Sequence, residues 1–168
     1  MMERKNSIKD VHLIMNYTRG LYKILEDDWQ KAAQQIGLTL AEQHALWIIY
    51  FEQKAPMSRI AEVGLWDLST VMQIVKRLKE KGLVKTEKDE NDLRISYVLL
   101  TEKGKQKHEQ SKELEIRLDD FVDEYSKQSD ETKHFMKQMI SFLADANRHF
   151  HGEDFIHWVN RTTKALGE

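Results

Sequence analysis

The chain has 168 residues, a formal net charge of −2 and no cysteine. The lack of cysteine excludes disulfides, thiolate metal sites and thiol-based redox sensing. A charged fraction of 32% and a single proline, Pro56, favour a helix-rich protein of one domain. Because no apolar run approaches the length of a membrane span or a signal peptide, we expect no membrane partner and a cytoplasmic location.

Charge is distributed unevenly along the chain. Between Lys76 and Lys88 six cations accompany two anions, a local charge of +4, whereas between Glu109 and Glu131 nine anions accompany three cations, a local charge of −6. The local field, and not the total charge, attracts a polyanion. Charge runs usually form solvated faces, so this asymmetry permits a nucleic-acid partner without demanding one.

The N-terminal part of the chain has the periodicity of one long helix over residues 8–36. Its apolar stripe ends before Gly37 and contains Val11, Ile14, Leu21, Leu25, Trp29 and Ala32. A stripe of this length needs a second surface, so we expect it to contact the C-terminal helices or a second subunit. Thr39-Leu-Ala-Glu42 then has the pattern of a capping box and opens the next helix, which should end at Ala55-Pro56.

Two short helices joined by a tight turn are predicted next, the arrangement of a helix-turn-helix. Ser58 is expected to cap the first helix, which ends near Gly64. The second helix begins near Asp67 and ends at Gly82. The pattern is common in proteins and by itself produces many false matches.

The second of these helices separates an apolar stripe from polar faces. The stripe consists of Leu68, Val71, Val75 and Leu78. The polar faces carry Ser69, Thr70, Gln73, Lys76 and Arg77. An amide can pair with adenine through two hydrogen bonds, hydroxyls contact base edges, and cations bind phosphates. We therefore expect the first three to read bases and the two cations to bind phosphate, with an ordinary amphipathic surface helix as the alternative.

A β-hairpin is predicted directly after this helix. Two β-prone runs, 83–88 and 95–100, flank the polar segment from Asp89 to Arg94. A hairpin in this place is the wing of a winged helix, and its tip would carry Arg94 towards the minor groove. Asp92, two residues earlier, is expected to orient the arginine.

Beyond the hairpin the sequence predicts more apolar helical surface than one lobe needs. Thr101 should cap a helix that runs to about Tyr125, with inward residues Leu114, Leu118, Phe121 and Val122. Ser129 should open another helix, and Gly152 should separate it from a last apolar segment. The surplus is best explained by a homodimer in which the terminal helices of two chains interlock.

Three motifs together resemble the MarR family of bacterial winged-helix regulators: Lys81-Gly82-Leu83-Val84, Asp92-Leu-Arg94 and Leu100-Thr101-Glu-Lys-Gly104. The resemblance implies a single domain over residues 1–168, mainly α with a small β-hairpin wing. Residues 38–104 would form a winged helix-turn-helix lobe that binds double-stranded DNA, and residues 8–36 and 105–168 a helical dimerisation region. The implied function is a nucleoid-associated, homodimeric transcriptional repressor that binds pseudo-palindromic promoter sites.

Other motifs are similar to a Bacillus subgroup of this family that regulates protease production and sporulation: Asp28-Trp-Gln, Glu42-Gln-His-Ala-Leu-Trp-Ile and Gly152-Glu-Asp-Phe155. One departure from the family pattern lies in the turn before the second helix. There Gly64 replaces a large aliphatic residue and Trp66 a small polar one, and the subgroup shares Gly64. We therefore expect the geometry of this turn to differ from that of most members.

Small phenolic or other aromatic effectors are common in the resembled family. They would lie between the dimerisation helices and the DNA-binding lobe. Candidate lining residues here are Tyr22, Trp29, His44 and Trp47. The alternative is that the same side chains fill this space, which would leave a repressor without an effector.

Other functional classes have weaker support. Glycine-rich phosphate loops, Gly-x-Ser-x-Gly elbows and His-Glu-x-x-His motifs are absent from the sequence, so we expect no enzyme activity and no cofactor. His149, His151 and His157 lie near carboxylates, but the first two point about 200° apart on a helix. No metal site is expected unless a break at Gly152 brings them together. A metal-responsive regulator and a winged-helix protein-interaction module are the alternatives to a DNA-binding regulator.

Overall fold

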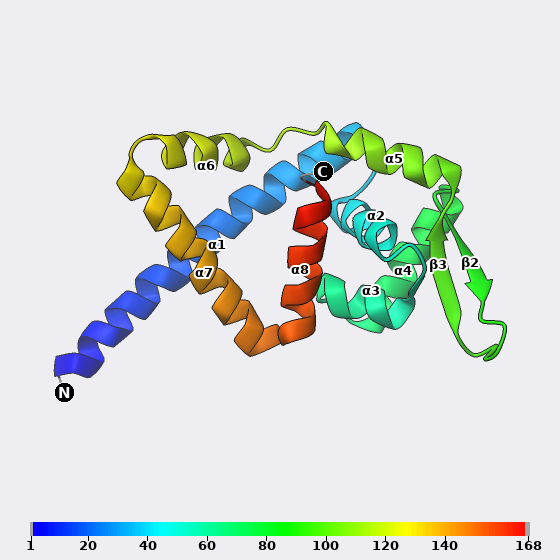
Figure 1. The fold of residues 1–168 in the computed structure, drawn as a ribbon, viewed down its shortest axis with the longest axis horizontal. Coiled ribbons are helices and arrows are strands. Elements are labelled where there is room, and N and C mark those ends of the chain that lie inside the picture. The colour runs from blue at the N-terminus through cyan, green and yellow to red at the C-terminus, as the bar shows by residue number, and fades with distance from the viewer. Residues whose placement is uncertain (1, 167–168) are drawn as a thin grey trace.

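The structure, a computed structural model, describes residues 2–166, with side chains from residue 8 onward. Helices dominate, and a small antiparallel sheet lies at one end of the molecule (Figure 1). The elements in chain order are α1 (Met2–Gln35), α2 (Leu40–Glu52), β1 (Ala55–Pro56), α3 (Met57–Gly64), α4 (Leu68–Glu80), β2 (Val84–Lys88), β3 (Ser96–Leu100), α5 (Glu102–Lys112), α6 (Arg117–Lys127), α7 (Asp130–His151) and α8 (Glu153–Leu166). The mainly α, winged helix-turn-helix fold expected from the sequence is confirmed.

The winged helix-turn-helix lobe has a closed apolar core. Its buried side chains come from the end of α1, from α2, α3 and α4, and from the strands, and they are Ala33, Leu38, Ala45, Leu46, Ile48, Ile49, Ala55, Ile60, Val63, Val71, Ile74, Val75, Leu78, Leu83, Val84 and Val98. Complete burial of one large aliphatic side chain stabilises a fold by about 1.5–3 kcal/mol relative to leaving it exposed. The lobe therefore carries enough buried surface to hold α4 and the hairpin in fixed positions.

The sheet has the strand order β1-β3-β2, with both pairs antiparallel. β2 and β3 pair along their whole length, with Thr86 opposite Val98, so the predicted hairpin is confirmed. The segment Ala55-Pro56 is a correction. It was expected only to end the preceding helix, but α2 ends at Glu52 and Ala55 pairs with Val98. A proline is tolerated here because β1 is an edge strand, where a missing N–H costs no ladder hydrogen bond.

Most predicted helix caps are present. In the capping box of α2, the Glu42 N–H donates to the Thr39 hydroxyl over 3.2 Å, and the Thr39 N–H donates to the Glu42 carboxylate over 2.8 Å. Ser129 caps α7 in the same manner. Ser58 does not cap α3, because that helix already begins at Met57. Pro56 of β1 takes the N-cap position instead, without a side-chain hydrogen bond.

The C-terminal part of α1 is fixed to α2 and α6 by three consecutive residues. Gln30 accepts a hydrogen bond from the first backbone N–H of α2 over 3.0 Å, and the Trp29 indole donates to Gln43 over 3.2 Å. Buried Asp28 accepts from the Arg117 Nε over 2.8 Å. The hydrogen bond from Arg117 is the main cause that lowers the pKa of Asp28. The motif Asp28-Trp-Gln therefore joins α1 to both α2 and α6.

One predicted helix is divided in two. The helix after Thr101 was expected to continue to Tyr125, but α5 ends at Lys112 and α6 begins at Arg117. Ile116 lies between them in extended conformation, with φ −126° and ψ 114°. The break allows α6 to lie against α1, and α7 then packs against α6 and α8 (Figure 1). Gly152, with φ 85°, separates α7 from α8 as predicted.

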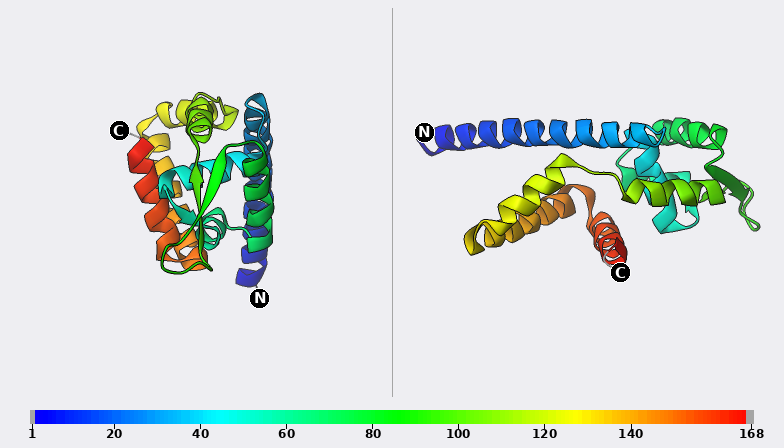
Figure 2. Two further views of the ribbon diagram at one scale, coloured as in Figure 1. Left: turned by 90° about the vertical axis from the view of Figure 1, so that its right-hand side faces the viewer. Right: turned by 90° about the horizontal axis from the view of Figure 1, so that it is seen from above.

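The terminal helices carry much exposed apolar surface. On α1 the exposed side chains are Ile8, Val11, Leu13, Ile14, Met15, Tyr17, Leu21, Tyr22 and Ile24, and on α6 and α7 they are Phe121, Phe135, Ile140, Phe142, Leu143 and Phe150. Phe121 was expected to point inward and is exposed instead. The N-terminal half of α1 extends well away from the lobe (Figure 2). Within residues 2–166, none of the helices combines the length and apolar character that a membrane-spanning helix needs.

Candidate nucleic-acid interface

Helix α4 is seated on the lobe by one apolar face. Val71, Ile74, Val75 and Leu78 are buried, whereas Leu68, which was expected to share their stripe, is 50% exposed. At about 100° per residue, Leu68 lies at the edge of the buried arc, and Ile74 takes a place nearer to its centre. The opposite face of α4 is directed away from the core.

The end of α4 is held by a buried carboxylate of α2. Glu42 accepts from the Lys81 ammonium over 2.7 Å and from the Arg77 Nε over 3.3 Å. Burial alone would raise the pKa of Glu42, but the hydrogen bond from Lys81, the Thr39 N–H and the positive charges outweigh it and lower this pKa. Arg77, expected to bind phosphate, therefore has one of its donors engaged within the lobe, while its side chain is 45% exposed.

The first turn of α4 is organised by Asp67. Its carboxylate accepts hydrogen bonds from the Ser69 hydroxyl, from the Thr70 N–H over 2.8 Å and from the Thr70 hydroxyl over 2.7 Å. These bonds, with that of Ser69 the largest cause, lower the pKa of Asp67 to about 2. Both hydroxyls that were predicted to read bases thus donate to the helix cap. Gln73 and Lys76, by contrast, are exposed and form no side-chain hydrogen bond within the described part of the chain.

The turn between α3 and α4 explains the unusual residues in the sequence. Leu65 adopts the left-handed conformation with φ 54°. The indole of Trp66 lies over Gly64, where an added Cβ would stand 2.3 Å from the ring carbon Cε3. Glycine is needed at position 64 because tryptophan occupies the space of its side chain. Trp66 also meets His44, with ring centroids 5.1 Å apart.

The wing is fixed at its base and projects freely at its tip (Figure 1). At the base, the Thr101 hydroxyl donates to the Gly82 carbonyl over 2.7 Å and accepts from the Gly104 N–H over 3.1 Å. A Cβ on Gly104 would stand 2.0 Å from the Leu83 carbonyl oxygen, so only glycine fits. These contacts explain the spacing of Leu-Thr-x-x-Gly in the sequence.

At the tip, the Asp92 carboxylate accepts hydrogen bonds from both the side chain and the backbone N–H of Arg94, the latter over 3.0 Å. The Arg94 Nε donates to one carboxylate oxygen over 2.9 Å and Nη2 donates to the other over 2.8 Å. Asp89 accepts from two backbone N–H groups of the same loop, over 2.8 and 2.9 Å. The Arg94 side chain is 90% exposed, so the pair directs the guanidinium without burying it.

The four aromatic residues predicted to line an effector pocket do not surround one cavity. Tyr22 is exposed on α1, and Trp29 packs on His44 with ring centroids 5.1 Å apart. Burial lowers the pKa of His44 to about 4, so this imidazole stays neutral near pH 7. The Trp47 indole donates to the Ser111 hydroxyl over 2.7 Å. Three of the four side chains therefore fill space between α1, α2, α4 and α5.

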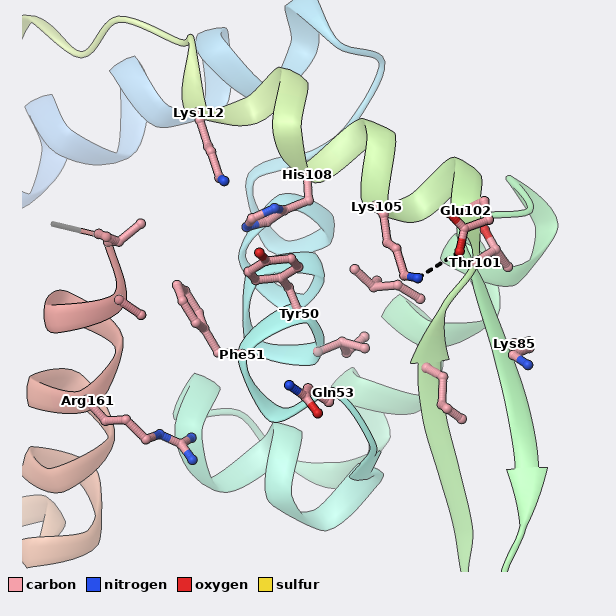
Figure 3. A pocket seen from close by; sticks show the side chains of 15 residues that line it. Tyr50, Phe51, Gln53, Lys85, Thr101, Glu102, Lys105, His108, Lys112 and Arg161 are labelled. Carbon is pink, nitrogen blue, oxygen red and sulfur yellow. Dashed lines mark hydrogen bonds and ion pairs between the residues drawn. The ribbon is translucent and has the colours of Figure 1, made fainter. Parts of the chain in front are cut away.

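An open cavity of about 1010 Å³ lies instead between α2, α5, β3 and the end of α8 (Figure 3). His108 forms its inner wall and stacks on Tyr50, with ring centroids 3.6 Å apart. His108 is fully buried; its Nδ1 lies 3.5 Å from the Glu109 carboxylate, and its Nε2 has no hydrogen-bond partner among the described residues. Burial is the main cause that lowers its pKa. Lysines and one arginine stand at the rim: Lys85, Lys105, Lys112 and Arg161.

The histidines near the end of α7 are dispersed. His149 lies against Phe150, His151 lies against Phe155, and His157 is 3.8 Å from Glu153. Among the described side chains, histidine, aspartate and glutamate do not gather in groups of three that would hold a metal ion. The break at Gly152 therefore does not bring the histidines together.

Comparison with known proteins places the lobe in a family. The family model described as MarR family matches residues 38–96, which hold α2 to the start of β3. Residues 38–96 form a MarR family domain. A relative from Geobacillus thermodenitrificans, named HTH-type transcriptional regulator Hpr, is 38% identical over 108 residues, which cover 62% of this chain and 54% of the relative. The chain thus matches about half the length of such curated relatives.

Solved structures of MarR proteins share the fold. A MarR-like transcription regulator from Bacillus cereus has a TM-score of 0.68 at 23% identity and covers 82% of this chain and 98% of its own. A mutant MarR from E. coli complexed with operator DNA has a TM-score of 0.62 at 19% identity, with 77% and 94% covered. At these identities the likeness establishes the fold, and the residues of the MarR domain must carry the functional argument.

Proposed function

We propose that this chain is a homodimeric transcriptional repressor that binds a pseudo-palindromic promoter site in double-stranded DNA. The observation that carries the proposal is the pairing of two surfaces on one rigid lobe. The outward face of α4 presents Gln73 and Lys76, and the wing beside it presents an almost fully exposed Arg94. An α-helix fits the major groove, and an arginine on a flanking hairpin reaches the minor groove.

The exposed apolar faces of α1, α6 and α7 support the homodimer. In a two-fold dimer the two α4 helices would meet major grooves about one helical turn apart, with the wings outside them. Binding across a promoter in this manner blocks access to it, which is the simplest mechanism of repression. Hpr is a transcriptional regulator by its name, and the E. coli MarR structure contains operator DNA, so both relatives are consistent with the proposal.

In vitro selection of duplexes from genomic fragments, followed by titration, tests the proposal. The full chain should retain a specific set of duplexes and bind them as a dimer. Gln73→Ala should weaken the selected site by about 1–3 kcal/mol and relax base preference at one position per half-site. Lys76→Ala should weaken all duplexes alike and lower the salt slope by roughly one unit.

Failure to select any duplex would contradict DNA binding and favour a protein-interaction module. A Gln73→Ala variant with unchanged base preference would instead contradict the placement of α4 in the groove. Asn16→Glu, on the polar face of α1, is the control for added negative charge far from the lobe. It should leave the selected sequence unchanged.

We also propose that a small aromatic anion enters the cavity beside His108 and releases DNA. The stacked His108 and Tyr50 rings supply a flat wall, and the cations at the rim, each of which pairs with a neighbouring carboxylate, would exchange that partner for the carboxylate or phenolate of the ligand. The Nε2 of His108, which has no hydrogen-bond partner among the described residues, would gain one from such a ligand. Titration with 4-hydroxybenzoate should release the selected duplex from the wild type. Lys112→Ala should need several-fold more of it, and equal sensitivity would contradict this site.

A further inference from the structure

The exposed surface of α4 is more apolar than a phosphate-binding face requires. Leu68 is 50% exposed and Met72 is 56% exposed, and Leu65 in the preceding turn is also 50% exposed. Large apolar side chains gathered at one place on a surface usually mark a contact with another molecule. The two residues on the helix lie one turn apart, so their side chains are neighbours.

Angular positions place these residues beside the polar reading face. At about 100° per residue, Met72 lies about 40° from Leu68 and Lys76 about 80° from it, in the same direction. Thr70 and Arg77 lie on the other flank of the helix. One flank of α4 is therefore apolar at its beginning and cationic further along.

The polar groups at the beginning of α4 already form hydrogen bonds with one another. The Ser69 and Thr70 hydroxyls donate to Asp67, and the Asp67 carboxylate stays ionised and accepts hydrogen bonds from both residues. What this turn can offer to a base edge is mainly methyl and methylene surface. In the major groove the one apolar group on a base edge is the 5-methyl group of thymine.

Charge decides which occupant suits this flank. Lys76 and Lys79 lie beside the two apolar residues, and Lys79 reaches across to the Thr86 hydroxyl of β2 over 3.1 Å. Cations next to an apolar strip fit a polyanion that carries methyl groups in its groove, and they disfavour a second apolar helix. The strip also belongs to the lobe and is separate from the apolar faces of α1, α6 and α7.

We propose that Leu68 and Met72 recognise the 5-methyl groups of thymines in the major groove of the DNA site. The inference rests on the proposed function and gives the sequence preference of α4 an apolar part beside Gln73. Sequence selectivity would then require thymines at fixed positions within each half-site, because adenine, guanine and unmodified cytosine present no methyl group there.

The test uses the duplex selected by the full chain, synthesised again with single thymines replaced by deoxyuridine. Each replacement removes one methyl group and keeps every hydrogen-bonding group of the base. At one or two positions per half-site the wild type should lose about three- to fivefold in affinity, as expected for the burial of one methyl group. Met72→Ala or Leu68→Ala should lose a similar factor on the thymine duplex and show no further loss on deoxyuridine at the same position.

Two variants serve as controls. Lys76→Ala should bind all duplexes more weakly but keep the full sensitivity to deoxyuridine. Met72→Leu should keep most of that sensitivity, because it retains an apolar side chain of similar size. Circular dichroism and dimerisation should be unchanged in all these variants, since the altered side chains are exposed.

The outcomes separate this inference from the proposed function. A wild type that binds its selected duplex and ignores deoxyuridine at every thymine would overturn methyl recognition and leave DNA binding intact. Sensitivity that persists unchanged in both Met72→Ala and Leu68→Ala would also overturn it, because other residues would then contact the methyl groups. A chain that selects no duplex would contradict both proposals.

Discussion

The lobe and the terminal helices are both built from amphipathic helices, but the apolar side chains of the lobe are buried whereas many of those on the terminal helices are exposed. In the lobe, Leu46, Ile48, Ile49 and Ile74 are all but fully buried. On α1, by contrast, Val11, Ile14 and Leu21 are 50%, 58% and 46% exposed in the single chain. The sequence gives both regions regular apolar stripes, so periodicity alone does not distinguish them.

The difference lies in where each stripe finds its partner. The lobe stripes meet within about 65 residues of chain, and capping and hairpin contacts hold them together. The α1 stripe has no comparable partner among the described residues over its N-terminal half. In the proposed homodimer, a second copy of the chain would cover this apolar face. The lobe thus buries its apolar stripes within itself, whereas the terminal helices leave theirs for the proposed dimer interface.

Hydrogen bonds and ion pairs connect the terminal helices to the lobe. Asp28, Trp29 and Gln30 lie on α1 where the exposed stripe ends and the buried part begins. At the other end of the chain, Arg161 of α8 pairs with Glu52, which also binds Arg59 of α3 over 3.3 Å. Changes in the terminal helices can therefore reach the helix-turn-helix at two places.

The largest expected effect on the free energy of unfolding comes from a substitution that creates a cavity in the lobe core. Leu46→Ala removes a fully buried side chain and should lower the free energy of unfolding by about 2–5 kcal/mol. Urea denaturation followed by circular dichroism measures this. The loss should be the same at every protein concentration, since Leu46 lies far from the proposed interface. A loss that grows on dilution would contradict the division into two regions.

The second effect should depend on concentration. Ile14→Glu puts a charge into the proposed interface and should weaken dimerisation at least about 100-fold, about 2.8 kcal/mol. Analytical ultracentrifugation across a concentration series measures the dissociation constant. Asn16→Glu adds the same charge on the opposite face of α1 and should leave the dimer intact. Equal behaviour of the two variants would show that the stripe does not form the interface.

The lobe was more predictable from sequence than the terminal helices, and the reasons are local. The Thr39 capping box, the hairpin around Asp92 and Arg94, and the Leu-Thr-x-x-Gly motif each act within a few residues. Their geometry therefore follows from the residues present. The MarR resemblance rests on those same motifs.

Predictions failed where distant contacts decide the outcome. The break between α5 and α6 depends on the position of α1, which Arg117 contacts through Asp28. Leu68 was assigned to the buried stripe because a pattern of threes and fours does not reveal which edge residue reaches the core. Whether Trp29, His44 and Trp47 line or fill a pocket was left open by the sequence, and the cavity beside His108 involves α8 from the far end of the chain.

A third prediction tests whether the unusual turn belongs to the rigid lobe. Gly64→Ala would place a Cβ 2.3 Å from the Trp66 ring and should cost about 2 kcal/mol, as overpacking typically does. Trp66→Ala opens that space, so the double variant should recover part of the loss from Gly64→Ala. Thermal unfolding of the two single variants and the double variant measures the coupling. Additive losses would contradict the packing of Trp66 on Gly64.

The smallest effect concerns Arg94, which belongs to the lobe but should not contribute to its stability. Arg94→Ala should reduce specific DNA affinity about tenfold, about 1.4 kcal/mol, with unfolding and dimerisation unchanged. An arginine in the minor groove responds to groove width, which A/T-rich sequence narrows, so the loss should be larger with A/T-rich than with G/C-rich flanks.

Asp92→Ala should give a smaller loss of the same kind. The Arg94 side chain then keeps its charge but loses the hydrogen bonds to the carboxylate, the shortest of 2.8 and 2.9 Å, that direct it. Titrations of both variants on one selected site with each type of flank decide the matter. If Asp92→Ala bound DNA more tightly than the wild type, the carboxylate would oppose binding and would not serve to orient Arg94. If Arg94→Ala still distinguished the flanks, another part of the molecule would read them, and the wing would serve the lobe only as a structural hairpin.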